Sequence, residues 1–228
     1  MFTPIKKFIK STPVIGPLLV QARARKVKSS ADYWDHRYKS GGNSGPGSYN
    51  RLAEFKASFL NRFVADHNIA SVIEFGSGDG SQLKLAHYPA YLGIDVSAKA
   101  VELCRTTFAN DPSKNFIISS ELEPGTTADL ALSLDVIYHL TENSVYEAYM
   151  HRLFQSALRF VIIYSSNMEQ PWEAKHVRHR HFTRWVERNQ PHWVLHSTIK
   201  NAYPWDPANP EQTSFADFYV FSRRQTPN

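Results

Sequence analysis

Short apolar runs alternate with amphipathic stretches along most of this chain. Apolar runs that predict strands lie at 72–75, 90–97, 115–119, 128–135, 160–164, 193–199 and 218–222. The stretches 51–67, 98–109 and 141–160 repeat apolar residues at three- and four-residue steps, which predicts helices with one buried face. Shorter helices are expected at 30–38 and 184–189. Strands that alternate with helices in this way predict an α/β fold with a mostly parallel sheet.

The first 28 residues have a different character, since they contain seven lysine or arginine residues and no acidic residue. The apolar stretch 13–20 within them is too short to span a bilayer, and Pro13, Gly16 and Pro17 interrupt it. We therefore expect no cleaved signal peptide. The basic segment 1–28 could rest on an anionic membrane surface, such as the inner membrane, or lie as a solvated arm, and the sequence leaves both open.

Chain length and composition limit the number of domains, the cysteine chemistry and the class of partner. A chain of 228 residues fits one domain, at 31–228, behind a basic arm at 1–30. The single cysteine, Cys104, excludes an internal disulfide and a multi-cysteine zinc site, which suits a reducing cytoplasm. The net charge of +5 favours anionic partners, without choosing among nucleic acid, membrane surface and acidic substrate.

The stretch 71–80, Ser-Val-Ile-Glu-Phe-Gly-Ser-Gly-Asp-Gly, is the most informative part of the chain. A short apolar strand that carries Glu74 is followed by three glycines at alternate positions, and a helix-like run follows at 81–86. Glycine lets a backbone turn sharply and approach a ligand closely. The spacing differs from the dinucleotide-binding pattern G-x-G-x-x-G. A carboxylate just before the turn would repel phosphate but could hold an ammonium group.

Two further acids end predicted strands. Asp95 follows Glu74 by 21 residues, which is enough for one strand–helix–strand unit. Its carboxylate could accept hydrogen bonds from ribose hydroxyls, or it could belong to a helix start together with Ser97. Asp135 ends the apolar run 128–135 and is followed by an apolar-His-Leu turn that contains His139.

These three motifs, in this order, resemble those of class I S-adenosylmethionine (SAM) dependent methyltransferases, whose first motif is (D/E)-x-G-x-G-x-G. The resemblance is close over 71–140. It implies a Rossmann-like, seven-stranded, mostly parallel sheet with an antiparallel last strand, helices on both faces, and SAM as cofactor. It also implies the following cofactor-binding residues: Arg51, Glu74, Gly76, Ser77, Gly78, Asp95, Val96, Glu121 and Asp135.

Arg51 is the candidate partner of the methionine carboxylate of SAM, although a surface ion pair with Glu54 is the alternative. The glycine-rich loop 39–50 is either a flexible linker or a lid over cofactor and substrate. The order of YWDHRY, GGNSGPGSY and EFGSGDG also resembles bacterial members of the superfamily that are associated with glycan assembly.

An acceptor-binding insertion is expected at 168–182, where six of the eight residues in 175–182 are lysine, arginine or histidine. This run could clamp an anion through its arginines, bind a metal through its histidines, or form a solvated basic face. Its spacing matches no strong zinc pattern, so no metal is expected. The predicted substrate-binding residues are Tyr49, Ser165, Asn167, His176, Arg178 and Arg180.

The predicted reaction is O-methylation of an anionic small molecule or of a glycan or glycolipid precursor. His139 is the first candidate for a general base because histidine accepts a proton near neutral pH, and a packed histidine beside the cofactor is its alternative role. Asp135 would orient His139 or bind SAM, and His179 is the reserve base. An RNA methyltransferase and a non-catalytic SAM-binding protein stay open, but no nucleic-acid partner is expected because the positive charge is clustered.

Overall fold

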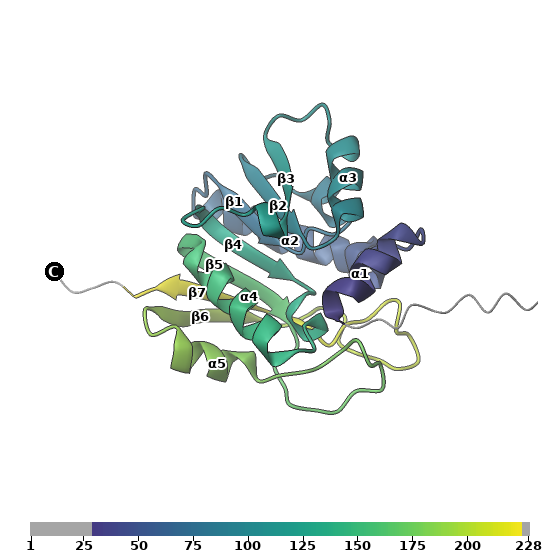
Figure 1. Ribbon diagram of the computed structural model, residues 1–228. Coiled ribbons are helices and arrows are strands. Elements are labelled where there is room, and N and C mark those ends of the chain that lie inside the picture. The colour runs from purple at the N-terminus through teal and green to yellow at the C-terminus, as the bar shows by residue number, and fades with distance from the viewer. Residues whose placement is uncertain (1–28, 225–228) are drawn as a thin grey trace, which may run out of the picture.

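The computed structural model describes residues 29–224, which fold around a seven-stranded sheet with the order β3-β2-β1-β4-β5-β7-β6 (Figure 1). Strand β7 runs antiparallel to both of its neighbours, and the other pairings are parallel. This confirms the predicted sheet and its reversed last strand. The strands are β1 (Val72–Phe75), β2 (Tyr91–Asp95), β3 (Lys114–Ile118), β4 (Ala128–Leu134), β5 (Ala157–Ser165), β6 (Trp193–Ile199) and β7 (Asp217–Arg223).

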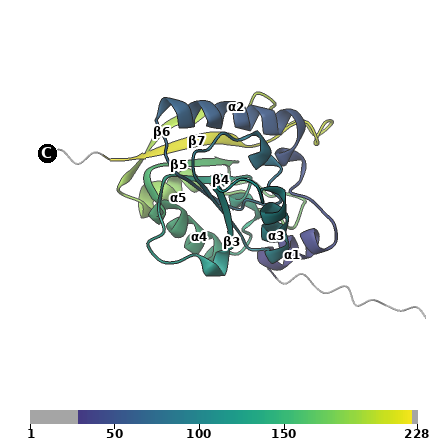
Figure 2. The ribbon, with the colours of Figure 1, turned by 90° about the horizontal axis from the view of Figure 1, so that it is seen from above.

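Helices cover both faces of the sheet. Side chains of β5 alternate, so Ile162 and Tyr164 pack into one core while Val161 and Ile163 pack into the other. The first core lies under α2 (Asn50–Asp66) and α3 (Ala98–Thr107), and the second lies under α4 (Asn143–Gln155) and α5 (Phe182–Asn189) (Figures 1 and 2). Both faces are therefore occupied, which leaves the carboxyl ends of the strands as the accessible edge.

Helix α1 (Ser30–Lys39) lies at that edge, beside α3 (Figure 1). The Ser29 side chain accepts a hydrogen bond from the Asp32 amide and caps the helix start. Ser97 Oγ, at the start of α3, lies 3.2 Å from Asp35 Oδ1, and the Ser30 amide donates to Glu142 Oε1 at 2.8 Å. Helix α1 is thus attached to elements on both sides of the sheet.

Two predicted helices are wrong in extent. The run 81–86 forms only a 3₁₀ turn at Gln82–Leu85, because the glycine turn and Pro89 leave little chain between β1 and β2. The helix expected over 141–160 ends at Gln155, since β5 already begins at Ala157. Periodicity alone does not separate a buried helix end from a short apolar strand.

The basic run 175–182 is not helical before Phe182, where α5 begins. Across residues 29–224, no helix is both long and apolar enough to cross a bilayer. The two alternatives for the segment 1–28, membrane contact and a solvated arm, concern residues outside the part that the structure describes.

Candidate active site

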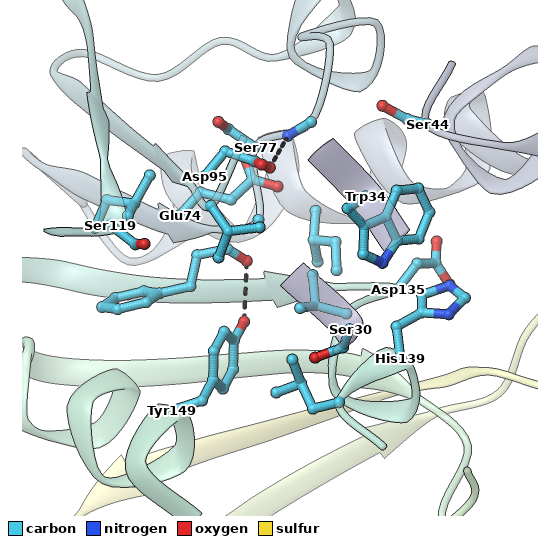
Figure 3. A pocket seen from close by; sticks show the side chains of 18 of the residues that line it. Ser30, Trp34, Ser44, Glu74, Ser77, Asp95, Ser119, Asp135, His139 and Tyr149 are labelled. Atoms are coloured by element: carbon cyan, nitrogen blue, oxygen red, sulfur yellow. Dashed lines mark hydrogen bonds between the residues drawn. The ribbon is translucent and has the colours of Figure 1, made fainter. Parts of the chain in front are cut away.

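A cavity of about 160 Å³ lies where β1, β2 and β4 end, and α1 covers one side of it (Figure 3). Most of its wall is apolar, including Phe75, Ile94 and Val136. Trp34 of α1 also lines the cavity, beside His139 (Figure 3). The side chains that bring a titratable group to the lining include Lys56, Glu74, Asp95, Asp135 and His139.

The glycine turn after β1 forms one wall of the cavity. Gly76 and Gly78 have φ of +86° and +58°, values that residues with a side chain rarely adopt. A Cβ on Gly76 would lie 2.4 Å from Val136 Cγ2, and one on Gly78 would lie 2.4 Å from Ser44 Oγ. The turn therefore requires glycine at both positions, for backbone conformation and for close packing.

The amides of this turn are already hydrogen-bonded within the protein. The Gly76 and Ser77 amides both donate to the Ile94 carbonyl oxygen, at 2.7 and 3.1 Å. The Gly78 amide donates to Asp95 Oδ2 at 3.0 Å (Figure 3). A phosphate-binding loop needs free amides and a helix start behind them. Neither feature is present among the described residues here, so this turn is not built for a dinucleotide pyrophosphate.

Glu74 brings a carboxyl group to the cavity floor. Its Oε2 accepts a hydrogen bond from the Tyr91 hydroxyl at 2.6 Å. Burial raises the pKa of Glu74 to about 7, against the opposing effects of the Tyr91 hydrogen bond and the nearby Lys56. A cation in the cavity would favour the ionised form of this carboxyl.

Asp95 ends β2, and its two carboxylate oxygens accept from the amides of Gly78 and Ser97. Burial raises the pKa of Asp95 to about 6, although these backbone hydrogen bonds oppose the rise. Ser97, not Asp95, caps α3, because its hydroxyl accepts from the Ala100 amide. Val96, which lies between Asp95 and Ser97, lines the cavity and is 46% exposed, so an apolar side chain lies at the cavity mouth.

Asp135 follows β4 and forms an ion pair with Lys56 that the sequence did not predict. Lys56 Nζ lies 2.6 Å from Asp135 Oδ2, and the Tyr138 hydroxyl donates to Asp135 Oδ1 at 2.9 Å. The Lys56 side chain is only 1% exposed. Lys56 lies one helical turn from both Leu52 and Leu60, on the apolar stripe of α2. A lysine on that stripe was the available sequence signal.

His139 lies in a 3₁₀ turn after β4 and lines the cavity next to Trp34 (Figure 3). Its Nδ1 lies 3.0 Å from the carbonyl oxygen of His176, which can only accept, so Nδ1 carries the proton and Nε2 has the free lone pair. Burial lowers the pKa of His139 to about 4. The imidazole is therefore neutral at physiological pH and able to accept a hydrogen bond.

His179, the reserve base, does not line this cavity. Its Nδ1 lies 2.6 Å from Ser166 Oγ, and its ring packs against Trp172 and Phe215. Its Nε2 is buried without a hydrogen-bond partner in the described chain. The ring of Tyr138 lies 6.4 Å from that of His179. His179 thus belongs to an aromatic cluster next to the cavity.

Arg178 and Arg180, the arginines of the anion-clamp alternative, donate to backbone carbonyl oxygens. Arg178 donates to the Thr141 carbonyl oxygen, and Arg180 donates to the carbonyl oxygens of Leu140 and Thr141. The Arg178 amide also donates to the Tyr138 carbonyl oxygen at 2.7 Å. These bonds fasten the basic run to the turn that holds His139. His176, predicted to bind substrate, stacks on Tyr33 with ring centroids 4.6 Å apart.

Two predicted cofactor contacts point away from the cavity. Arg51 donates to the Gln212 carbonyl oxygen at 2.7 Å and lies over the ring of Tyr203, so its guanidinium is directed away from the cavity. The alternative ion pair with Glu54 is not formed. Glu121 accepts from the Ile118 amide at 3.0 Å, because its carboxylate folds back on the end of β3.

The other residues predicted to contact the acceptor are hydrogen-bonded outside the cavity or have no hydrogen-bond partner in the described chain. Tyr49 donates to Asp79 Oδ2 at 2.8 Å, and Asn167 bonds with Thr183. Ser165 is fully buried, and its hydroxyl has no hydrogen-bond partner in the described chain.

The loop 40–49 is hydrogen-bonded to the glycine turn. The Ser44 amide donates to Asp79 Oδ2 at 2.9 Å, and the Asp79 amide donates back to Ser44 Oγ at 3.0 Å. Tyr38 adds a hydroxyl contact to Ser44 Oγ at 3.0 Å. This segment therefore lies against the cavity wall, although whether it opens as a lid stays a prediction. Among residues 29–224, no group of three His, Cys, Asp or Glu side chains could hold a metal ion.

Comparison with known proteins agrees with this geometry. Residues 49–198 match the sequence model of a family described as a methyltransferase domain. No curated protein sequence matches the chain. Many solved structures match, and their identities of 12–18% in the cases below establish the fold alone.

The N-methyltransferase NodS from Bradyrhizobium japonicum WM9, solved with S-adenosylhomocysteine (SAH), has a TM-score of 0.63 at 12% identity, covering 86% of this chain and 100% of that chain. Magnesium protoporphyrin IX methyltransferase from Synechocystis PCC 6803, also with SAH, has a TM-score of 0.61 at 15% identity, covering 85% and 98%. The methyltransferase domain of bacterial CtHen1-C has a TM-score of 0.58 at 18% identity, covering 76% and 99%.

Proposed function

The chain belongs to the family of methyltransferase domains, and from that premise we propose that it transfers the methyl group of SAM to a hydroxyl group of an anionic small molecule or glycan precursor. Solved structures with this fold hold SAM or SAH. When bound, SAM supplies an electrophilic methyl group on a sulfonium centre. The reaction is then mainly a matter of holding the acceptor oxygen in line.

One observation carries the cofactor assignment. The amides of the glycine turn donate hydrogen bonds within the protein, while the ends of three strands place Glu74, Asp95 and Asp135 around one cavity. This arrangement disfavours phosphate and favours a ligand with positive charge. SAM has two positive groups, its ammonium and its sulfonium, and one carboxylate. Glu74 and Asp95 are the residues that would hold the cofactor, with Asp95 towards the ribose hydroxyls and Val96 flanking the adenine.

His139 is the residue proposed to contact the acceptor. Its proton is on Nδ1, so Nε2 can accept a hydrogen bond from an acceptor hydroxyl and direct the oxygen lone pair towards the methyl group. A pKa of about 4 makes the imidazole a weak base. Orientation of the hydroxyl is therefore its main contribution. Nε2 takes up the hydroxyl proton as the new oxygen–carbon bond forms and the sulfur–carbon bond breaks.

The anionic class of acceptor is supported by the basic run beside His139. In the described chain, no carboxylate lies within ion-pair distance of Lys175, Arg178 or Arg180. Trp172 and Trp205 pack edge to face close by, and Trp205 is partly exposed. Aromatic rings next to positive charge suit a sugar or a flat acid.

The test is an acceptor screen with radiolabelled SAM. One arm contains acidic oligosaccharides and hydroxy acids, and the second contains mixed RNA, because the net charge of +5 would also serve an RNA methyltransferase. Label on a glycan or acid, lost at least tenfold in His139→Gln but kept in the exposed control His196→Gln, is the expected result. Label on RNA alone would replace the proposed acceptor class, and equal turnover in both variants would remove the role of His139.

A further inference from the structure

Lys56 is a buried charge in the cavity that the predicted site left out. It projects from α2 between apolar neighbours, and its side chain lines the cavity while remaining 1% exposed. Its Nζ lies 2.6 Å from Asp135 Oδ2 and 5.3 Å from the centre of the Tyr164 ring. An ammonium group this deeply buried requires partners for its charge and for its donors.

The partners of Lys56 are incomplete. A lysine ammonium has three N–H donors, and among the described residues Asp135 Oδ2 is the only hydrogen-bond acceptor of Nζ. A buried donor without an acceptor is unfavourable, and the side chain borders the cavity. Unused donors on a buried cation at a cavity wall form a site for an anionic group.

The surrounding charge limits which anion can bind there. Glu74 and Asp95 border the same cavity and Asp135 pairs with Lys56, so an isolated phosphate would meet nearby carboxylates. A carboxylate that arrives on the same molecule as positive groups avoids this repulsion. The amino-acid tail of SAM has that composition, with an ammonium next to a carboxylate.

Resting on the proposed function, we propose that Lys56 binds the carboxylate of the methionine portion of SAM and that Asp135 holds the lysine in position. This assigns to Lys56 the role expected of Arg51, whose guanidinium is instead bonded to the Gln212 carbonyl oxygen. The loop 40–49 encloses the pair, since a Cβ on Gly47 would lie 2.7 Å from Asp135 Oδ2. The contact lets the site select ligands that have the amino-acid tail.

The proposal is tested by calorimetric titration with two ligands. SAH has the tail, and 5′-deoxy-5′-methylthioadenosine is the same nucleoside thioether without it. We expect Lys56→Met to weaken SAH binding at least tenfold and to leave methylthioadenosine binding within twofold of the wild type. The control is Lys99→Met, a half-buried lysine that pairs with Glu102 away from the cavity, which should leave both affinities unchanged.

Three results would overturn the proposal, and they differ from one another. Unchanged SAH affinity in Lys56→Met would show that the ammonium does not contact the carboxylate. Equal weakening of both ligands would make Lys56 a structural residue of the cavity instead. Absence of SAH binding to the wild-type protein would remove the proposed function itself, and this inference with it.

Discussion

Removing the charge of Asp135 should destabilise the protein far more than removing a surface charge. The change Asp135→Asn preserves the shape of the side chain, and asparagine tolerates the φ of +60° at this position as aspartate does. The substitution therefore isolates the charge. Lys56, 1% exposed, would be left as a buried cation that has lost its ion-pair partner.

The magnitude follows from the geometry of the pair. At the 2.6 Å separation of Lys56 Nζ and Asp135 Oδ2, Coulomb attraction with an effective dielectric constant of about 20 is roughly 6 kcal/mol, and desolvation offsets much of it. Breaking one partner of a buried pair costs about 3–5 kcal/mol. The amide oxygen of asparagine can still accept from Nζ, so we expect a loss of about 3 kcal/mol in the free energy of unfolding.

The assay is urea unfolding followed by tryptophan fluorescence, with a double-mutant cycle. Asp135→Asn, Lys56→Met and the double variant give the coupling energy, which should be about 2 kcal/mol. The control Glu102→Gln breaks a surface pair at 2.9 Å and should cost under about 1 kcal/mol. A loss in Asp135→Asn no larger than in this control would refute the view that Lys56 depends on Asp135.

Two further changes test the glycine turn and the buried acid. Gly78→Ala should weaken SAH binding at least tenfold and lower the melting temperature, since the new Cβ would lie 2.4 Å from Ser44 Oγ. The control Gly125→Ala isolates the backbone strain, because Gly125 also has a positive φ but a Cβ there would meet no atom within 4 Å. Equal losses of melting temperature in the two variants would contradict the role of crowding at Gly78. The pKa of Glu74 rises from 4.5 to about 7 on folding, so the folded state binds more protons than the unfolded state between these pH values. The stability that Glu74 contributes is therefore complete below pH 4.5 and is lost as the pH rises through 7. The total loss in the free energy of unfolding is about 3 kcal/mol. Melting temperatures from pH 5 to 8 should therefore fall more steeply for the wild type than for Glu74→Gln, and parallel curves would contradict the raised pKa.

The positions of the three acids and of the glycine turn could be predicted from the sequence, because each depends only on residues that are neighbours in the chain. A strand that ends in an acid places that acid at the carboxyl edge of a parallel sheet, whatever the rest of the chain does. Glu74, Asp95 and Asp135 therefore meet at one cavity although they lie far apart in the chain. The glycine turn was similarly local, since its three glycines predicted a sharp turn, and all three adopt positive φ.

The partners of the charged side chains did not follow, because they depend on contacts between distant segments. Lys56 and Asp135 are 79 residues apart, and a lysine in a helix is usually a surface residue. Arg180 belongs to a run whose composition indicated an anion, yet it donates to carbonyl oxygens 39 and 40 residues earlier. Composition gives the charge of a segment, whereas tertiary packing decides which acceptors its donors meet.

The central claim is that this cavity binds an adenosyl amino acid and not a dinucleotide. Calorimetric titration of the wild-type protein with SAH, and separately with NAD, tests this claim most directly. The account predicts saturable binding of SAH with one site per chain and no binding of NAD, because the amides of the glycine turn are already bonded to Ile94 and Asp95. Binding of NAD without binding of SAH would contradict it.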